Sequence, residues 1–162
     1  MYENDLFILL DGTYDDENIS GEQLEFLTST INKNAALSTN IFVFVHQLIW
    51  WNKNNEFKNI KTNWPPDVPD SNNYWVEVEP LLAHTKKPVY IFAGDLGAHN
   101  KATPYMYHKK NNISYVAGGM GNLKNDNFLI VRIGKEGKVA LDIIALQGEQ
   151  NRFGKLEDYQ LP

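Results

Sequence analysis

Six short apolar runs, rich in β-branched and aromatic residues, are set between polar or glycine-containing stretches, a pattern typical of buried strands. They cover residues 6–10, 41–46, 88–93, 113–117, 128–133 and 139–144. Helical patterns separate the first three runs. We therefore predict an α/β fold with a β-α-β-α-β core, whose right-handed crossovers make these three strands parallel. The last two runs flank Gly134–Gly137 and predict an antiparallel hairpin.

The first helix is expected to begin at Ser20. Residues 20–23 have the spacing of a capping box, in which the Ser20 hydroxyl takes the amide of Gln23 and the Gln23 side chain reaches back. An apolar stripe follows, and the polar run 32–34 ends the helix. A second helix is expected within residues 72–87. Because proline breaks a helix interior, this helix either starts near Glu79 or is kinked at Pro80.

Between the second strand and the second helix lies a long irregular region, residues 47–71, with several tryptophans. Disordered segments are poor in aromatic residues, so we predict an ordered flap beside the strand ends. Two roles stay open for Trp50 and Trp51: stacking on a base or sugar, or packing against the body of the domain. The last dozen residues are polar and expected to be peripheral.

Composition narrows the function classes. The 162 residues suit a single domain, 1–162, and the net charge of −5 argues against a nucleic-acid partner. Zero cysteines exclude a disulfide scaffold and a thiolate metal site. No stretch has the roughly 18 apolar residues of a membrane span, and the acidic amino terminus lacks the basic flank of a signal peptide. We therefore expect no membrane partner and, by default, a cytoplasmic location.

Two polar residues follow strands that should be neighbours. His46 ends the run 41–46, and Asp95 follows the run 88–93 in Gly-Asp-Leu-Gly. Ligands of open α/β sheets bind beyond the carboxyl ends of strands, so both residues should face one crevice. His46 is either a metal ligand or a structural residue, and Asp95 either binds a cation or accepts amides in a turn. His99 could join such a site, whereas His84 and His108 are expected at the surface.

Residues 118–121, Gly-Gly-Met-Gly, suggest a phosphate loop. Such a loop should lead into a helix, and the sequence that follows is typical of a strand, so we favour a tight turn with close backbone approach. The positions expected to contact a ligand at this edge are Trp50, Trp51, Gly94, Gly97, Asn100, Gly118 and Gly119.

The order of these segments resembles the carboxyl-terminal half of a calcineurin-like metallophosphoesterase. Residues 7–11 look like the family's strand ending in Leu-Asp, and residues 20–27 are similar to its Gln-x-x-Trp-Leu helix opening, with Phe26 in the tryptophan place. Residues 41–46 look like the strand that delivers a metal-binding histidine. Residues 89–97 match the strand before Gly-His-x-His, and the 118–121 loop with its hairpin resembles the closing strands.

This resemblance implies half of a two-sheet sandwich and, at His46 and Asp95, a divalent metal site for Mn, Fe or Zn at low occupancy. Asp95 takes the place of the first histidine of Gly-His-x-His, and Gly97, which has no ligating side chain, takes the second. The family's earlier Asp-x-His, Gly-Asp-x-x-Asp and Asn-His motifs would lie before Met1. Since a two-metal phosphoesterase needs enough ligands for two ions, we expect the chain alone to be inactive as a hydrolase.

Three interpretations remain. In the first, the chain is a shortened relative that has lost catalysis and keeps a binding or interaction role. In the second, it is half of a split or truncated phosphoesterase completed by a complementary chain. In the third, it is an unrelated α/β domain that binds a small polar ligand. A half-sheet without its neighbouring strands exposes apolar surface, so we expect a homo-oligomer, most simply a dimer.

Overall fold

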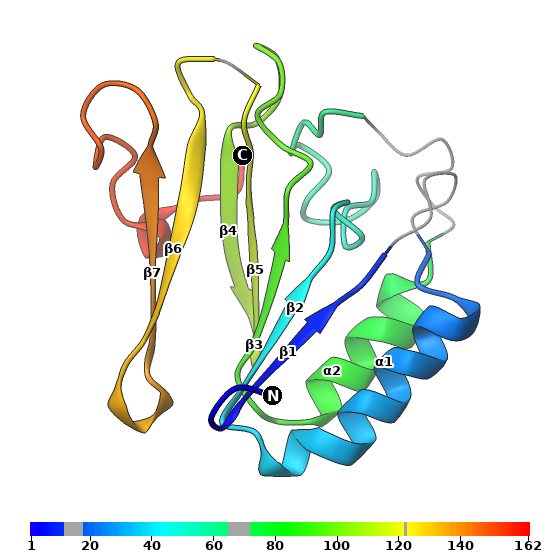
Figure 1. Ribbon diagram of the computed structural model, residues 1–162. Helices are drawn as coiled ribbons and strands as arrows, with labels where there is room; N and C mark the ends of the chain where they lie inside the picture. Colours follow the sequence, from blue (N-terminus) through cyan, green and yellow to red (C-terminus); the bar gives the residue numbers. More distant parts are fainter. Residues whose placement is uncertain (12–17, 65–71, 122) are drawn as a thin grey trace.

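A five-stranded sheet organises the molecule, in the order β1-β2-β3-β5-β4 (Figure 1). The computed structural model describes residues 1–11, 18–64, 72–121 and 123–162. The strands are β1 (Asp5–Leu9), β2 (Asn40–Phe44), β3 (Val89–Ala93), β4 (Tyr105–Lys110) and β5 (Ile113–Gly118). β1, β2, β3 and β5 are parallel, and β4 pairs antiparallel with β5. The predicted α/β class with a parallel β-α-β-α-β core is confirmed.

Two helices cover one face of this sheet (Figure 1): α1 (Gly21–Asn34) and α2 (Glu79–His84). A π-helical turn, η2 (Tyr74–Val78), leads directly into α2, which begins at Glu79 and has Pro80 in its first turn. The predicted start near Glu79 is therefore confirmed. None of the helices that the structure describes is long and apolar enough to cross a membrane.

The capping-box prediction is wrong in its hydrogen bonds. Ser20 is the N-cap residue of α1, as expected, but its side chain makes no capping hydrogen bond. The Gln23 side chain instead accepts the backbone N–H of Asp11 at 3.2 Å. Gln23 therefore links the residue after β1 to the first turn of α1 and does not cap the helix.

The helix-facing side of the sheet carries the larger core. Alternate positions of every strand point to it, with Leu6, Ile41 and Ile91 at most 3% exposed. Trp50, Trp51 and Phe57 of the flap belong to the same core, which gives the flap its order. The described part of the flap contains neither helix nor strand.

The opposite side is aromatic. Phe7, Phe42 and Tyr90 lie side by side in register on β1, β2 and β3, with ring centroids 4.9 and 5.3 Å apart. Phe44 and Phe92 form a second pair at 5.1 Å. We call the side chains of Phe7, Leu9, Phe44 and Tyr90, with the buried rings between them, the aromatic face.

A hairpin of β6 (Asn127–Ile133) and β7 (Val139–Ala145) packs over only part of this side (Figure 1). The predicted hairpin is confirmed, with the short helical turn η3 (Lys135–Gly137) at its tip. The carboxyl-terminal segment, with η4 (Leu156–Asp158), is less peripheral than expected, since Leu156 is 1% exposed in the core beneath the hairpin. Another short turn, η1 (Ala35–Leu37), follows α1.

Strand β4 was not predicted from the sequence, because its polar carboxyl end with two lysines obscures the alternation of buried and exposed residues. Met106 is the fully buried position of this edge strand. His108, expected at the surface, is only partly exposed: its ring is half-buried and lies nearly perpendicular to the Phe57 ring, 5.3 Å away. Burial lowers the pKa of His108, an effect that Glu56 at 3.6 Å opposes. His84 is exposed, as expected.

Candidate functional site

The carboxyl edge of the sheet is closed by contacts between the flap and the turn after β3. Asn63 of the flap donates its backbone N–H to the Asp95 carbonyl at 3.1 Å, and its side-chain oxygen accepts the N–H of Ala98 at 2.7 Å. The Asn63 amide and the backbone N–H of Trp64 also donate to the Asp95 carboxylate. The Asp95 carboxylate therefore accepts N–H groups from the flap rather than from its own turn.

His46 and Asp95 lie close enough to interact electrostatically. Burial raises the pKa of the Asp95 carboxyl, and the neighbouring His46 and the hydrogen bonds from the flap partly offset that rise. The His46 carbonyl accepts the N–H of Gly94 at 3.0 Å, which joins the residues after β2 and β3. The Asp95 residue is 7% exposed, whereas His46 is an exposed residue just beyond β2. The predicted neighbourhood of these two residues is present.

Among the residues that the structure describes, no third ligand joins them. Within the described ranges, no group of three or more His, Asp or Glu side chains is placed to hold a metal ion. Gly97 has a φ of +76°, and a Cβ there would lie 3.1 Å from the carbonyl oxygen of Gly119. Any side chain at this position would thus be strained and crowded by backbone.

The Gly118–Gly121 loop packs directly against the turn after β3. A Cβ at Gly119 would overlap the carbonyl oxygen of Leu96, and one at Gly121 would overlap the backbone of Ala98. The loop leads toward β6 rather than into a helix. Close backbone approach, the favoured interpretation of these glycines, is what the contacts show, and the helix N-terminus that would bind a phosphate is replaced by a strand.

Trp50 and Trp51 offer little ring surface to a ligand. They are 0% and 8% exposed, and the Trp51 indole donates to the Ile60 carbonyl at 3.0 Å. The Trp50 ring lies 5.4 Å from that of Tyr115. Both rings thus pack in the core, the second of the two roles left open for them. Trp64, by contrast, is 80% exposed.

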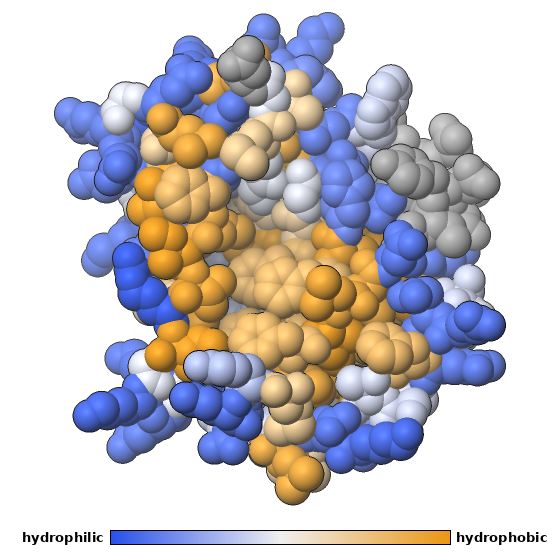
Figure 2. Space-filling model, in the orientation of Figure 1, coloured by the Kyte–Doolittle hydropathy of each residue, from blue (hydrophilic) through white to orange (hydrophobic). Residues whose placement is uncertain are grey.

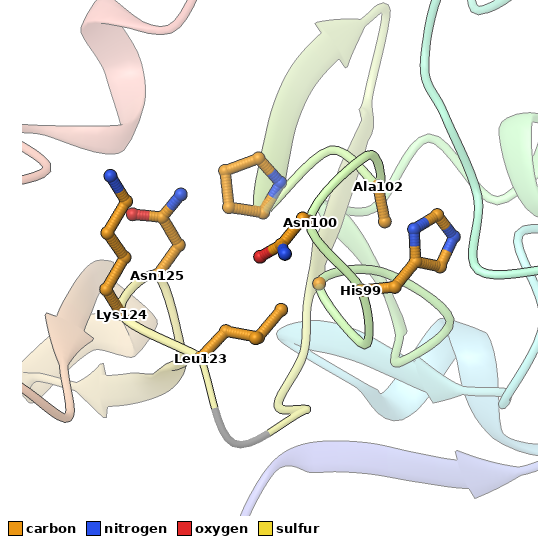
Figure 3. A pocket seen from close by; sticks show the side chains of 8 residues that line it. His99, Asn100, Ala102, Leu123, Lys124 and Asn125 are labelled. Carbon is orange, nitrogen blue, oxygen red and sulfur yellow. The ribbon is translucent and has the colours of Figure 1, made fainter.

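His99 and Asn100 line a small pocket beside the edge. The pocket has a volume of about 60 Å³, room for water rather than for an organic ligand. In Figure 3, His99 lies across the pocket from Lys124 and Asn125. His99 is exposed, and its ring nitrogen accepts the N–H of Lys101 at 3.2 Å, so it stays outside the His46–Asp95 pair.

Asn63, which hydrogen-bonds the flap to the turn after β3, was not predicted as a site residue. Asparagine is common throughout residues 52–73, so nothing in the pattern distinguishes Asn63 from its neighbours. Comparisons with protein-family models, with curated proteins and with solved structures find no match to this chain.

Proposed function

We propose that this chain is a catalytically inactive metallophosphoesterase-like domain that serves as an interaction module, binding another polypeptide chain at its aromatic face. The observation that carries the proposal is the apolar surface at β1, where Phe7 is 38% and Leu9 is 74% exposed. Phe44 and Tyr90 continue this surface as half-buried side chains. Figure 2 shows it as an apolar hollow beside the β6–β7 hairpin. Contiguous exposed apolar surface of this kind marks interaction sites.

The proposed loss of catalysis follows from the small number of possible metal ligands. A two-ion site that generates hydroxide needs ligands for both ions, and the expected positions supply only His46 and Asp95. The carboxylate of Asp95 accepts hydrogen bonds from Asn63 and Trp64, which take up part of its capacity to bind a cation. The conformation of Gly97 and the backbone packed against it leave no room for a third ligand there.

A second candidate is half of a split metal-dependent phosphoesterase, completed by another chain. The observation in its favour is the closeness of His46 and Asp95 at the carboxyl edge, where the resemblance expects metal ligands. In that case, the complementary chain would supply the remaining ligands and the catalytic acid.

Metal binding and hydrolysis test the proposed inactivity. We would titrate the purified chain with Mn²⁺ and Zn²⁺ by calorimetry, and assay hydrolysis of bis(p-nitrophenyl) phosphate with each ion. We expect no stoichiometric binding and no hydrolysis above that of a His46→Ala, Asp95→Ala double variant. Stoichiometric binding or hydrolysis that this double variant abolishes would overturn the inactive assignment and favour the split enzyme.

A further inference from the structure

We infer that the partner is a second copy of the chain, which binds at the β1 edge of the aromatic face by antiparallel pairing of β1 with β1 across a two-fold axis. The inference rests on the proposed interaction role and names its partner. It also fixes a register, in which Phe7 of one copy lies opposite Leu9 of the other.

The outer edge of β1 offers unpaired backbone groups. Apart from a bridge between Tyr2 and Asp5, β1 is paired only with β2 in the described part of the chain. The backbone N–H of Leu10 donates to the Phe44 carbonyl at 2.8 Å, so even-numbered positions point toward β2. Successive residues of a strand alternate in direction. The N–H and C=O groups of Phe7 and Leu9 therefore point away from the sheet, toward a strand that could be added.

The two edges of the sheet differ in how they resist pairing. At the β4 edge, Lys109 and Lys110 are exposed, and Lys110 forms an ion pair with Glu56 at 3.1 Å. Charged side chains, lysine above all, are a common protection of edge strands. Residues 6–9 of β1 carry no charge, no proline and no glycine. Within the described residues, the β1 edge is thus the one open to a further strand.

The Tyr2–Asp5 bridge selects the register. Asp5 donates its N–H to the Tyr2 carbonyl and accepts the N–H of Tyr2, both at 3.0 Å, so its outward groups are occupied. A two-fold pairing centred on Phe7 would need those groups. A pairing centred on Ile8 instead sets Phe7 against Leu9 of the other copy, twice, and each pair exchanges two N–H···O bonds.

Apolar side chains are exposed on both sides of the sheet. Phe7 and Leu9 lie on the aromatic face, while Phe26 of α1, 48% exposed, lies on the helix side. α1 is the outer of the two helices, next to β1 (Figure 1). In a two-fold edge pair, both copies of α1 lie on the same side of the extended sheet. Each copy has a net charge of −5, so two copies can approach most easily at an uncharged strand.

Sedimentation velocity over a wide concentration range tests the dimer. We expect a concentration-dependent shift from the 18.6 kDa of one chain to twice that mass. Leu9→Lys should weaken dimerisation at least about tenfold, because it places a lysine at the paired edge. Val76→Lys is the matched control, since Val76 is 75% exposed on η2, and it should leave the dimer unchanged. Thermal melts confirm that both variants fold.

Disulfide trapping tests the register, since the chain has no cysteine of its own. Paired residues that exchange hydrogen bonds have Cα atoms about 5.5 Å apart, within disulfide range. A mixture of Phe7→Cys and Leu9→Cys chains should therefore oxidise to the mixed dimer in preference to either homodimer. A chain that stays monomeric at every concentration, or a dimer that Leu9→Lys leaves intact, would overturn the inference. The metal and hydrolysis assays are independent of that result, so failure of the dimer leaves the inactive assignment standing.

Discussion

Gly119→Ala should be among the most damaging single-methyl changes in this chain. A Cβ at Gly119 would lie 2.7 Å from the carbonyl carbon of Leu96 and 3.1 Å from the carbonyl oxygen of Gly94, and would overlap the Leu96 oxygen. All three atoms belong to the backbone of the turn after β3, so no side-chain rotation relieves the clash. The 118–121 loop and this turn must move apart.

The magnitude follows from the kind of clash. Overpacking in a close-packed site costs about 1–3 kcal/mol, and the backbone origin places Gly119→Ala at the upper end, about 3 kcal/mol. For a chain of this size, that loss lowers Tm by about 6–12 °C. Differential scanning calorimetry measures the shift directly. The turn that moves also holds Asp95, so the variant should loosen the flap.

Gly134→Ala is the matched control. Its nearest contact would be the Lys138 carbonyl oxygen at 3.5 Å, an ordinary van der Waals distance, and its φ of −85° suits alanine. We expect a change of no more than about 0.5 kcal/mol, the usual range at an unconstrained surface position. A Gly119→Ala protein that melts with the wild type, or no lower than Gly134→Ala, would refute the close approach of the two loops.

Two further predictions concern ionisable side chains. Burial raises the pKa of Asp95, so its contribution to stability is fully present at low pH and is lost as the pH rises through the folded pKa. At neutral pH, the Asp95→Asn protein should therefore be at least as stable as the wild type, because asparagine keeps an oxygen for the N–H of Trp64. The Asp95→Ala protein should lose about 1–3 kcal/mol of unfolding free energy, measured by urea unfolding. Burial also lowers the pKa of His108, so the unfolded chain binds the proton first and stability should fall as the pH drops below about 6.5. His108→Gln should flatten that fall, and an equally steep pH profile in the variant would contradict the assignment.

The strands that form continuous apolar runs, and the helix start at Ser20, are the part of the fold that could be predicted. The parallel core follows from apolar runs separated by helical stripes, and Pro80 marks the start of α2. Strand β4 could not be recognised, because its pairing with β5 depends on tertiary contacts and its last residues are charged.

At the candidate site, the sequence predicts that His46 and Asp95 are neighbours, because the carboxyl ends of parallel strands meet at one edge. It does not predict what Asp95 binds. That depends on Asn63, which reaches the turn from a flap without periodic structure. The exposed aromatic face was equally hidden, since Phe7 and Leu9 alternate with buried residues just as a covered strand would.

The topology of the sheet also has a consequence for folding. Each parallel pairing joins strands that are separated in the sequence by a helix or by another strand, so the sheet has a high contact order. Such a sheet should assemble in milliseconds to seconds. The β6–β7 hairpin joins neighbouring strands and can close in about 1–10 μs. While the sheet assembles, the apolar residues of β1 stay without a neighbour for longer than any part of the hairpin. The strand inferred to join two folded copies is then also a segment prone to aggregate during refolding, and refolding yield should fall as protein concentration rises.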